Sequence, residues 1–120
     1  MILVDTSVWV DHLRRDNASL RALLDDAAVA CHPFVIGELA CGTLRNRHEI
    51  LEMLARLPSV TVVQHTEVLA LIESRRLMGR GPGWVDAHLL ASALVGNAPL
   101  WTVDLPLRVA AERLGVAASP

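Results

Sequence analysis

The sequence predicts an α/β domain whose central parallel sheet has four to five strands and is flanked by helices. Short apolar runs alternate with longer amphipathic segments along all 120 residues, which is the pattern of strands connected by crossover helices. The hydrophobic fraction is 52% and the charged fraction 20%, so the chain can build a buried core. No repeat, linker or low-complexity segment interrupts it, and we expect one domain over residues 1–120.

The elements follow from local patterns. The expected strands are the apolar runs 2–4, 29–31, 60–63 and 100–103, with a possible edge strand at 116–118. The expected helices have apolar residues at helical spacing and cover residues 8–13, 18–28, 33–44, 49–57, 67–78, 84–95 and 106–114. The cluster at 79–83, with three glycines and a proline, should break the chain before the most hydrophobic helix.

Composition excludes several functions. All 11 basic residues are arginine, so chemistry that requires a lysine is excluded. The formal charge of −2 argues against a generic basic nucleic-acid binder, and 3% aromatic residues without tyrosine argue against a base-stacking sheet. Cys31 and Cys41 are expected to be buried thiols of a cytoplasmic protein. No apolar run reaches membrane-spanning length, and residues 1–4 do not form a signal peptide.

Two acids follow expected strands. Asp5 comes directly after the run 2–4, and Asp104 directly after the run 100–103. Because parallel strands end at the same edge of a sheet, where open α/β sheets bind ligands, these carboxylates should meet there. Each could also simply cap a turn or a helix.

Two further acids lie on apolar helices. Glu38 has apolar neighbours and no cation one turn further along its helix, and Asp86 opens the most hydrophobic helix of the chain. A carboxylate in such surroundings is seldom buried without a partner. Glu38 could instead face solvent, and Asp86 could be a first-turn acid favoured by the helix dipole.

Four carboxylates at one site would repel one another unless one took up a proton or a cation lay between them. Ligands that offer only oxygen suit Mg²⁺ or Mn²⁺, and two such ions can activate water and stabilise the leaving oxygen in phosphodiester cleavage. The hydroxyls of Thr6, Ser7 and Thr102 could orient this site from behind, although capping and strand propensity also explain them.

The other polar and aromatic residues give weaker signals. His88 is two residues from Asp86, the wrong helical spacing for a shared ligand face, and is interpreted as structural; the other histidines form no ligand pattern. The three tryptophans are expected in the core, with Trp84 bordering the site. Arginines flank the two helical acids and could hold phosphates as well as cap helix ends; they are Arg45, Arg47, Arg75, Arg76 and Arg80.

Four segments together resemble the successive motifs of PIN-domain ribonucleases, and most of all the VapC-type toxins of bacterial toxin–antitoxin pairs. The segments are Val4-Asp5-Thr6-Ser7-Val8-Trp9, Glu38-Leu39-Ala40-Cys41-Gly42, Gly79-Arg80-Gly81 with Trp84-Val85-Asp86-Ala87-His88-Leu89-Leu90-Ala91, and Leu100-Trp101-Thr102-Val103-Asp104. The resemblance spans nearly the whole chain. It implies a compact α/β/α PIN fold, an endoribonuclease dependent on Mg²⁺ or Mn²⁺, a homodimer and inhibition by a VapB-like antitoxin.

The resemblance also implies a site. The family's catalytic, metal-binding acids map onto Asp5, Glu38, Asp86 and Asp104, and its hydroxyl position maps onto Thr102. The sequence departs from the pattern at 105–106, where a leucine and a proline stand in place of the basic residue that relatives often carry.

The sequence argues against two other phosphoryl-transfer classes and leaves a non-catalytic module open. A haloacid-dehalogenase phosphatase would need a second aspartate where Ser7 stands, and both it and a receiver domain would need a lysine. A PIN-like module could bind RNA or protein without catalysis. The apolar stripe in 49–57, formed by Ile50, Leu51 and Leu54 with Met53 beside it, could be core or an antitoxin groove.

Overall fold

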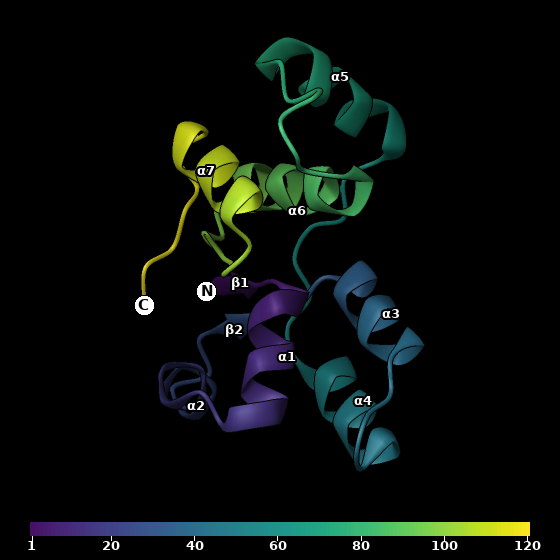
Figure 1. Cartoon of the computed structure of the whole chain (residues 1–120), viewed down its shortest axis with the longest axis vertical. Helices are drawn as coiled ribbons and strands as arrows, with labels where there is room; N and C mark the ends of the chain where they lie inside the picture. The colour runs from purple at the N-terminus through teal and green to yellow at the C-terminus, as the bar shows by residue number, and fades with distance from the viewer.

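The computed structural model describes residues 1–120 and contains seven helices around a small parallel sheet. In chain order the elements are β1 (Ile2–Val4), α1 (Thr6–Arg15), α2 (Ala18–Asp25), β2 (Val29–Ala30), α3 (Pro33–Cys41), α4 (Arg47–Arg56), α5 (His65–Arg75), α6 (Trp84–Val95), β3 (Leu100–Trp101) and α7 (Leu105–Arg113). Helices α1 to α4 lie on one side of the strands and α5 to α7 on the other (Figure 1). The expected α/β class is confirmed.

The sheet places β1 at its centre, with strand order β2-β1-β3. Both pairings are parallel: Leu3 is opposite Ala30 on one side and opposite Leu100 on the other. Leu3 and the following Val4 are completely buried, as expected for a strand covered on both faces. Strands β1 and β3 therefore end at the same edge, and the residues that follow them emerge side by side.

The two outer strands expected from sequence are reduced to single bridges. Ser59 bridges Cys31 at one edge, and Ala117 bridges Leu100 at the other, both in parallel orientation. The sheet thus has five parallel segments, of which three are strands. The expected strand over 60–63 is wrong in its extent, because the segment leaves the sheet after Val60, whose N–H donates to the Cys31 carbonyl (3.1 Å).

Residues 60–63 leave the sheet because their side chains pack in different places. Val60 belongs to the main hydrophobic core, whereas Val63 belongs to a small second cluster with Val68 of α5 and Ala87 of α6. Val62 between them is exposed. This segment carries the chain across to α5, whose apolar side packs on α6; α5 stands at the outer end of the molecule (Figure 1).

The helices match the expected ranges most closely where a strong local signal marks their ends. Helix α6 covers the predicted residues 84–95 and is buried along most of its length. Helix α3 ends at Cys41 rather than at residue 44, because Gly42 takes an extended conformation (φ −90°, ψ 179°). None of the helices is both long enough and apolar enough to cross a membrane.

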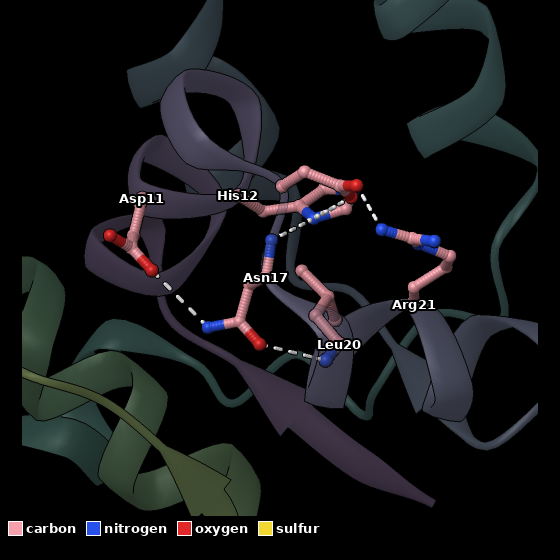
Figure 2. A network of polar contacts seen from close by, with 6 residues as sticks. Asp11, His12, Asn17, Leu20 and Arg21 are labelled. Atoms are coloured by element: carbon pink, nitrogen blue, oxygen red, sulfur yellow. Dashed lines mark hydrogen bonds and ion pairs between the residues drawn. The ribbon is translucent and has the colours of Figure 1, made fainter.

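A polar network fixes the corner between α1 and α2 (Figure 2). Asn17 caps α2 by accepting a hydrogen bond from the backbone N–H of Leu20 (3.0 Å), and its own N–H donates to His12 Nδ1 (3.0 Å). Its side-chain amide donates to Asp11, and Arg21 pairs with Asp16. These bonds satisfy backbone groups at the helix ends that would otherwise need water. They fix the end of α1 relative to the start of α2.

The loop between α5 and α6 presses against α7. Gly81 has a φ of +108°, which favours glycine, and a Cβ at this position would lie 2.7 Å from Pro106 Cβ. Any side chain here would force the loop and the first turn of α7 apart. The contact fixes the start of α6, which carries Asp86, relative to the start of α7, which carries Asp104.

Candidate metal-dependent active site

Asp5 lies at the carboxyl end of β1 and is buried (6% exposed). Its Oδ2 accepts hydrogen bonds from Ser7 Oγ (2.6 Å), Thr102 Oγ1 (2.8 Å) and the backbone N–H of Ser7 (3.3 Å). The interaction with the Ser7 N–H makes Asp5 the N-cap of α1, so the capping interpretation is correct. Capping alone does not account for all of these contacts, however. The bond from Thr102, 97 residues away, also ties Asp5 to the end of another strand.

Thr102 connects the ends of β1 and β3. Besides donating to Asp5, its hydroxyl oxygen accepts a hydrogen bond from the backbone N–H of Asp104 (3.0 Å) and lies 3.2 Å from Ser7 Oγ. Thr102 is itself buried, so this hydroxyl holds Asp5 and the chain around Asp104 in one arrangement. The expected role of Thr102 behind the acids fits these contacts.

Asp104 is the N-cap of α7. Its Oδ2 accepts a hydrogen bond from the backbone N–H of Leu107 (3.1 Å). Strand β3 already ends at Trp101, so Asp104 follows it at a short distance rather than directly. It still emerges at the same edge of the sheet as Asp5.

Glu38 projects from the exposed side of α3, and Thr6 holds it from the first turn of α1. Thr6 Oγ1 donates to Glu38 Oε1 (2.7 Å) across 32 residues of sequence. Of the two environments considered for Glu38, the solvent-facing one is correct, since its side chain is exposed. The expectation that Thr6 lies behind one of the acids is consistent with this contact.

Asp86 occupies the first turn of α6 and is half-buried. Its Oδ2 accepts a hydrogen bond from the backbone N–H of Gly83 (2.9 Å), the residue that precedes the helix. The pKa of Asp86 is raised, first because burial penalises the charged carboxylate and then because of the negative charges of Asp5, Asp104 and Glu38; the Gly83 N–H partly offsets this. Asp86 thus lies within electrostatic reach of three acids that come from other parts of the fold.

No cation offsets this repulsion. None of the four acids forms an ion pair; the ion pairs lie elsewhere on the surface, at Asp11, Asp16, Glu52 and Glu112. We expected the four carboxylates to converge on one point, and they do not. No group of three or more His, Cys, Asp or Glu side chains is placed to hold one metal ion. The charges of three of the acids therefore reach Asp86, but the side chains are not close enough together to bind one ion.

The donor set has the chemistry that a hard divalent cation requires. In each of the four carboxylates the protein donates hydrogen bonds to one oxygen only, and the other oxygen accepts none. These side chains therefore offer four carboxylate oxygens without protein partners, with no nitrogen or sulfur ligand among them. On this basis the residues fit Mg²⁺ or Mn²⁺, provided that the side chains move closer together around the ion.

A cluster of aromatic rings beside the site escaped the sequence patterns. His88 is completely buried, its Nε2 lies 2.9 Å from His65 Nδ1, and its ring contacts Trp84 and Phe34 with centroids 4.6 and 4.8 Å apart. His32 also packs on Phe34 (4.9 Å), and its ring lies 6.3 Å from that of His88. The histidines come from positions 32, 65 and 88, so no spacing could reveal the cluster. These contacts fit the interpretation of His88 as a structural residue. Phe34 belongs to α3, the helix that also carries Glu38.

The buried histidine His32 should make folding stability depend on pH. Burial, and secondly the nearby His88, lower the pKa of His32 to about 4 from 6.5. Between these values the unfolded chain binds a proton that the folded chain excludes, so stability should fall as pH is lowered from 6.5 to 4, by on the order of 3 kcal/mol in total. Urea denaturation across this range measures the effect. His32→Asn keeps a residue able to cap α3 in place of the Nδ1 acceptor and should reduce the slope; an unchanged slope would contradict the assignment.

Two expectations about other side chains change. Cys31 is a buried thiol whose burial raises its pKa to about 11, but Cys41 at the end of α3 is exposed, because the helix stops there and its last turn faces solvent. Of the tryptophans, Trp9 is fully buried, whereas Trp84 is 41% exposed. In α4, Leu54 is buried and its apolar neighbours pack against the main core, so the stripe is core.

This fold and this set of acids define a class of protein. Residues 2–112 match the family model described as PIN domain, and the chain belongs to that family. Two proteins named Ribonuclease VapC32, from Mycobacterium tuberculosis strains CDC 1551 / Oshkosh and ATCC 25618 / H37Rv, are each 55% identical to it over 118 residues. These residues cover 98% of this chain and 95% of each relative. The expected resemblance to VapC-type PIN domains is confirmed.

Proposed function

We propose that the chain is a single-domain endoribonuclease, dependent on Mg²⁺ or Mn²⁺, that acts as the toxin of a toxin–antitoxin pair in the cytoplasm. The relatives that cover almost its full length are named ribonucleases. The observation that carries the proposal is that Asp86 lies near the negative charges of Asp5, Glu38 and Asp104, while none of the four acids forms an ion pair. A site of this kind is costly in a protein that does not use it.

Asp5, Glu38 and Asp86 would hold the metal ion, and Asp104 would assist them. When bound, the metal supplies positive charge that activates water and stabilises the leaving oxygen of a phosphodiester. The chain supplies the orientation: Thr102 and Ser7 fix the Asp5 carboxylate, Thr6 fixes Glu38, and the Gly83 N–H fixes Asp86. Hydroxyl and backbone donors of this kind typically set the position of metal-binding carboxylates.

The substrate backbone would be held by arginine. The five arginines that flank the helical acids, namely Arg45, Arg47, Arg75, Arg76 and Arg80, form no ion pair with any carboxylate. Arg47 and Arg80 each donate one hydrogen bond to a backbone carbonyl, and the remaining guanidinium N–H groups of the five can bind phosphate oxygens in pairs. Because the chain has no lysine, arginine must provide all side-chain cations at this surface.

We also expect a homodimer and a VapB-like antitoxin as partners. Exposed apolar side chains around the start of α7, at Val103, Leu105 and Val109, support a protein contact there. The apolar stripe of α4 does not, since it packs against the core.

Removing divalent metal should abolish RNA cleavage. The protein is incubated with labelled RNA in EDTA, and Mg²⁺ or Mn²⁺ is then added in excess of the chelator. We expect no cleavage before the addition and recovery after it, because the acids cannot stabilise charge on a phosphodiester by themselves. Cleavage that persisted in EDTA would contradict the mechanism. RNA that is bound but never cleaved with either metal would favour the alternative of a non-catalytic binding module.

A further inference from the structure

Trp84 is an exposed aromatic side chain at the edge of the acidic site. It is 41% exposed, whereas Trp9 is fully buried and Trp101 is half-buried. It is the first residue of α6, two positions before Asp86 and directly after Gly83, whose N–H holds the Asp86 carboxylate. An indole that is partly open to solvent costs hydrophobic stabilisation that a buried one would provide, so its exposure calls for an explanation.

The ring of Trp84 is held in a fixed orientation. Its centroid lies 4.6 Å from that of His88 at an interplanar angle of 87°, and 5.5 Å from that of His65 at 43°. His88 is completely buried, lies within hydrogen-bond distance of His65 (2.9 Å), and packs on Phe34 (4.8 Å). The cluster therefore supports the indole on two sides, and binding a planar group on its open side would cost little side-chain entropy.

The cluster also connects the indole to the two helices that carry Asp86 and Glu38. Trp84 and His88 are four residues apart on α6 and share one of its faces, and Phe34 and Glu38 share a face of α3 in the same way. The contact between His88 and Phe34 brings these two faces together. Asp86 leaves the same first turn of α6 as Trp84 but on a different face, and Glu38 is on the helix that this cluster contacts.

We propose that the open face of Trp84 stacks on one base of single-stranded RNA, next to the phosphodiester that the acids cleave. This inference rests on the proposed ribonuclease function. Tyrosine is absent, the single phenylalanine is packed between two histidines, and the other tryptophans are more buried. Trp84 is therefore the strongest stacking group on this surface. Stacking on an aromatic ring tolerates every base, so Trp84 would set which nucleotide is held rather than read its hydrogen-bonding edge.

The test compares RNA cleavage and RNA binding by matched variants. Trp84→Leu keeps apolar bulk but removes the aromatic face, and Trp84→Phe keeps a smaller one. Leu69→Ala removes an exposed apolar side chain from α5 and is the control. We expect Trp84→Leu to lower kcat/KM and to raise the Kd for a short single-stranded RNA about 5- to 150-fold. Trp84→Phe should recover part of this loss, and Leu69→Ala should match the wild type.

The same RNA with single abasic units at successive positions separates stacking from a structural role. One abasic position should weaken binding to the wild type but not to Trp84→Leu, since the variant has already lost that contact. Binding should also quench the part of the tryptophan fluorescence that the wild type has and Trp84→Leu lacks. An equal loss on all RNAs with a lowered Tm, or no loss at all, would overturn the proposal. So would Trp84 emission that changes with protein concentration alone, because copies of the chain would then cover the ring.

Failure of the ribonuclease proposal gives a different result. In that case the wild type cleaves no RNA with Mg²⁺ or Mn²⁺. The Kd values for RNA binding then test the stacking proposal by themselves. If the wild type neither cleaves nor binds single-stranded RNA, both proposals fall. If it cleaves normally and Trp84→Leu behaves like it, only the stacking proposal falls.

Discussion

Replacing Asp86 by asparagine should reduce RNA cleavage more than about 100-fold while leaving the metal-free protein at least as stable as the wild type. Residues behind metal ligands typically cost 10- to 100-fold when removed, so loss of a ligand should cost more. Asparagine keeps the shape of the side chain and can still accept the Gly83 N–H, but it removes one of four repelling charges. The measurements are kcat/KM in Mg²⁺ and thermal unfolding in EDTA.

The matched control is Asp25→Asn at the end of α2, an exposed aspartate without a hydrogen-bond or ion-pair partner. It should change neither cleavage nor the response to metal. Adding Mn²⁺ should raise the Tm of the wild type and of Asp25→Asn, and it should raise that of Asp86→Asn less, because binding to the folded state is weaker. A metal-induced rise in Tm that was equal in all three proteins would argue that Asp86 is only a first-turn helix acid.

The pH dependence of folding stability in the metal-free protein gives a second test of the repulsion at Asp86. Because the pKa of Asp86 is raised in the folded state, the folded chain holds a proton that the unfolded chain has already lost. Stability should therefore fall as pH rises from the ordinary carboxyl pKa through this higher value. Asp86→Asn should lack that decline, and adding metal should reverse it in the wild type.

Thr102→Val should lower kcat/KM by about 10- to 100-fold, the range typical of groups that orient metal-binding residues. Valine has the same shape as threonine but cannot donate to Asp5 Oδ2, and it leaves the backbone N–H of Asp104 without its acceptor. Because the hydroxyl is buried, unfolding should also become easier by about 1–3 kcal/mol. Cleavage kinetics and Mn²⁺ binding by calorimetry, both well below the new Tm, separate the two effects.

Thr102→Ser supplies the rescue, since it restores the hydroxyl and should recover most of the activity. Thr66→Val, on the exposed surface of α5, is the control for the same chemical change. If Thr102→Val bound Mn²⁺ as tightly as the wild type and cleaved RNA at the same rate, Thr102 would be only a structural link between two strand ends.

Sequence reasoning predicted the positions of the acids better than their environments. Asp5 and Asp104 could be placed because strand ends share one edge of a parallel sheet, and helix α6 could be delimited because glycines precede and follow it. The exposure of Glu38 could not be predicted. Its apolar neighbours indicate a buried helix, but which side of α3 faces the core depends on how α3 packs against α1 and α4.

Contacts between residues that are far apart in the sequence could not be predicted. The bond from Thr6 to Glu38 and the bond from Thr102 to Asp5 join residues 32 and 97 positions apart. Neither spacing is a helical or strand period, so no local pattern encodes them. The same holds for the histidine cluster, and for residues 60–63, whose strand-like composition serves two separate apolar clusters instead of a sheet.

The tight contact of Gly81 with Pro106 has a genetic consequence. Asp86 is in the first turn of α6 and Asp104 caps α7, and this contact holds the starts of the two helices together, so a side chain at position 81 would disturb two of the four acids at once without altering either. A selection for alleles that no longer harm their host should therefore recover Gly81 substitutions alongside those of the four acids. Glycine at this position would look indispensable in such a survey, although it has no side chain with which to perform any chemistry.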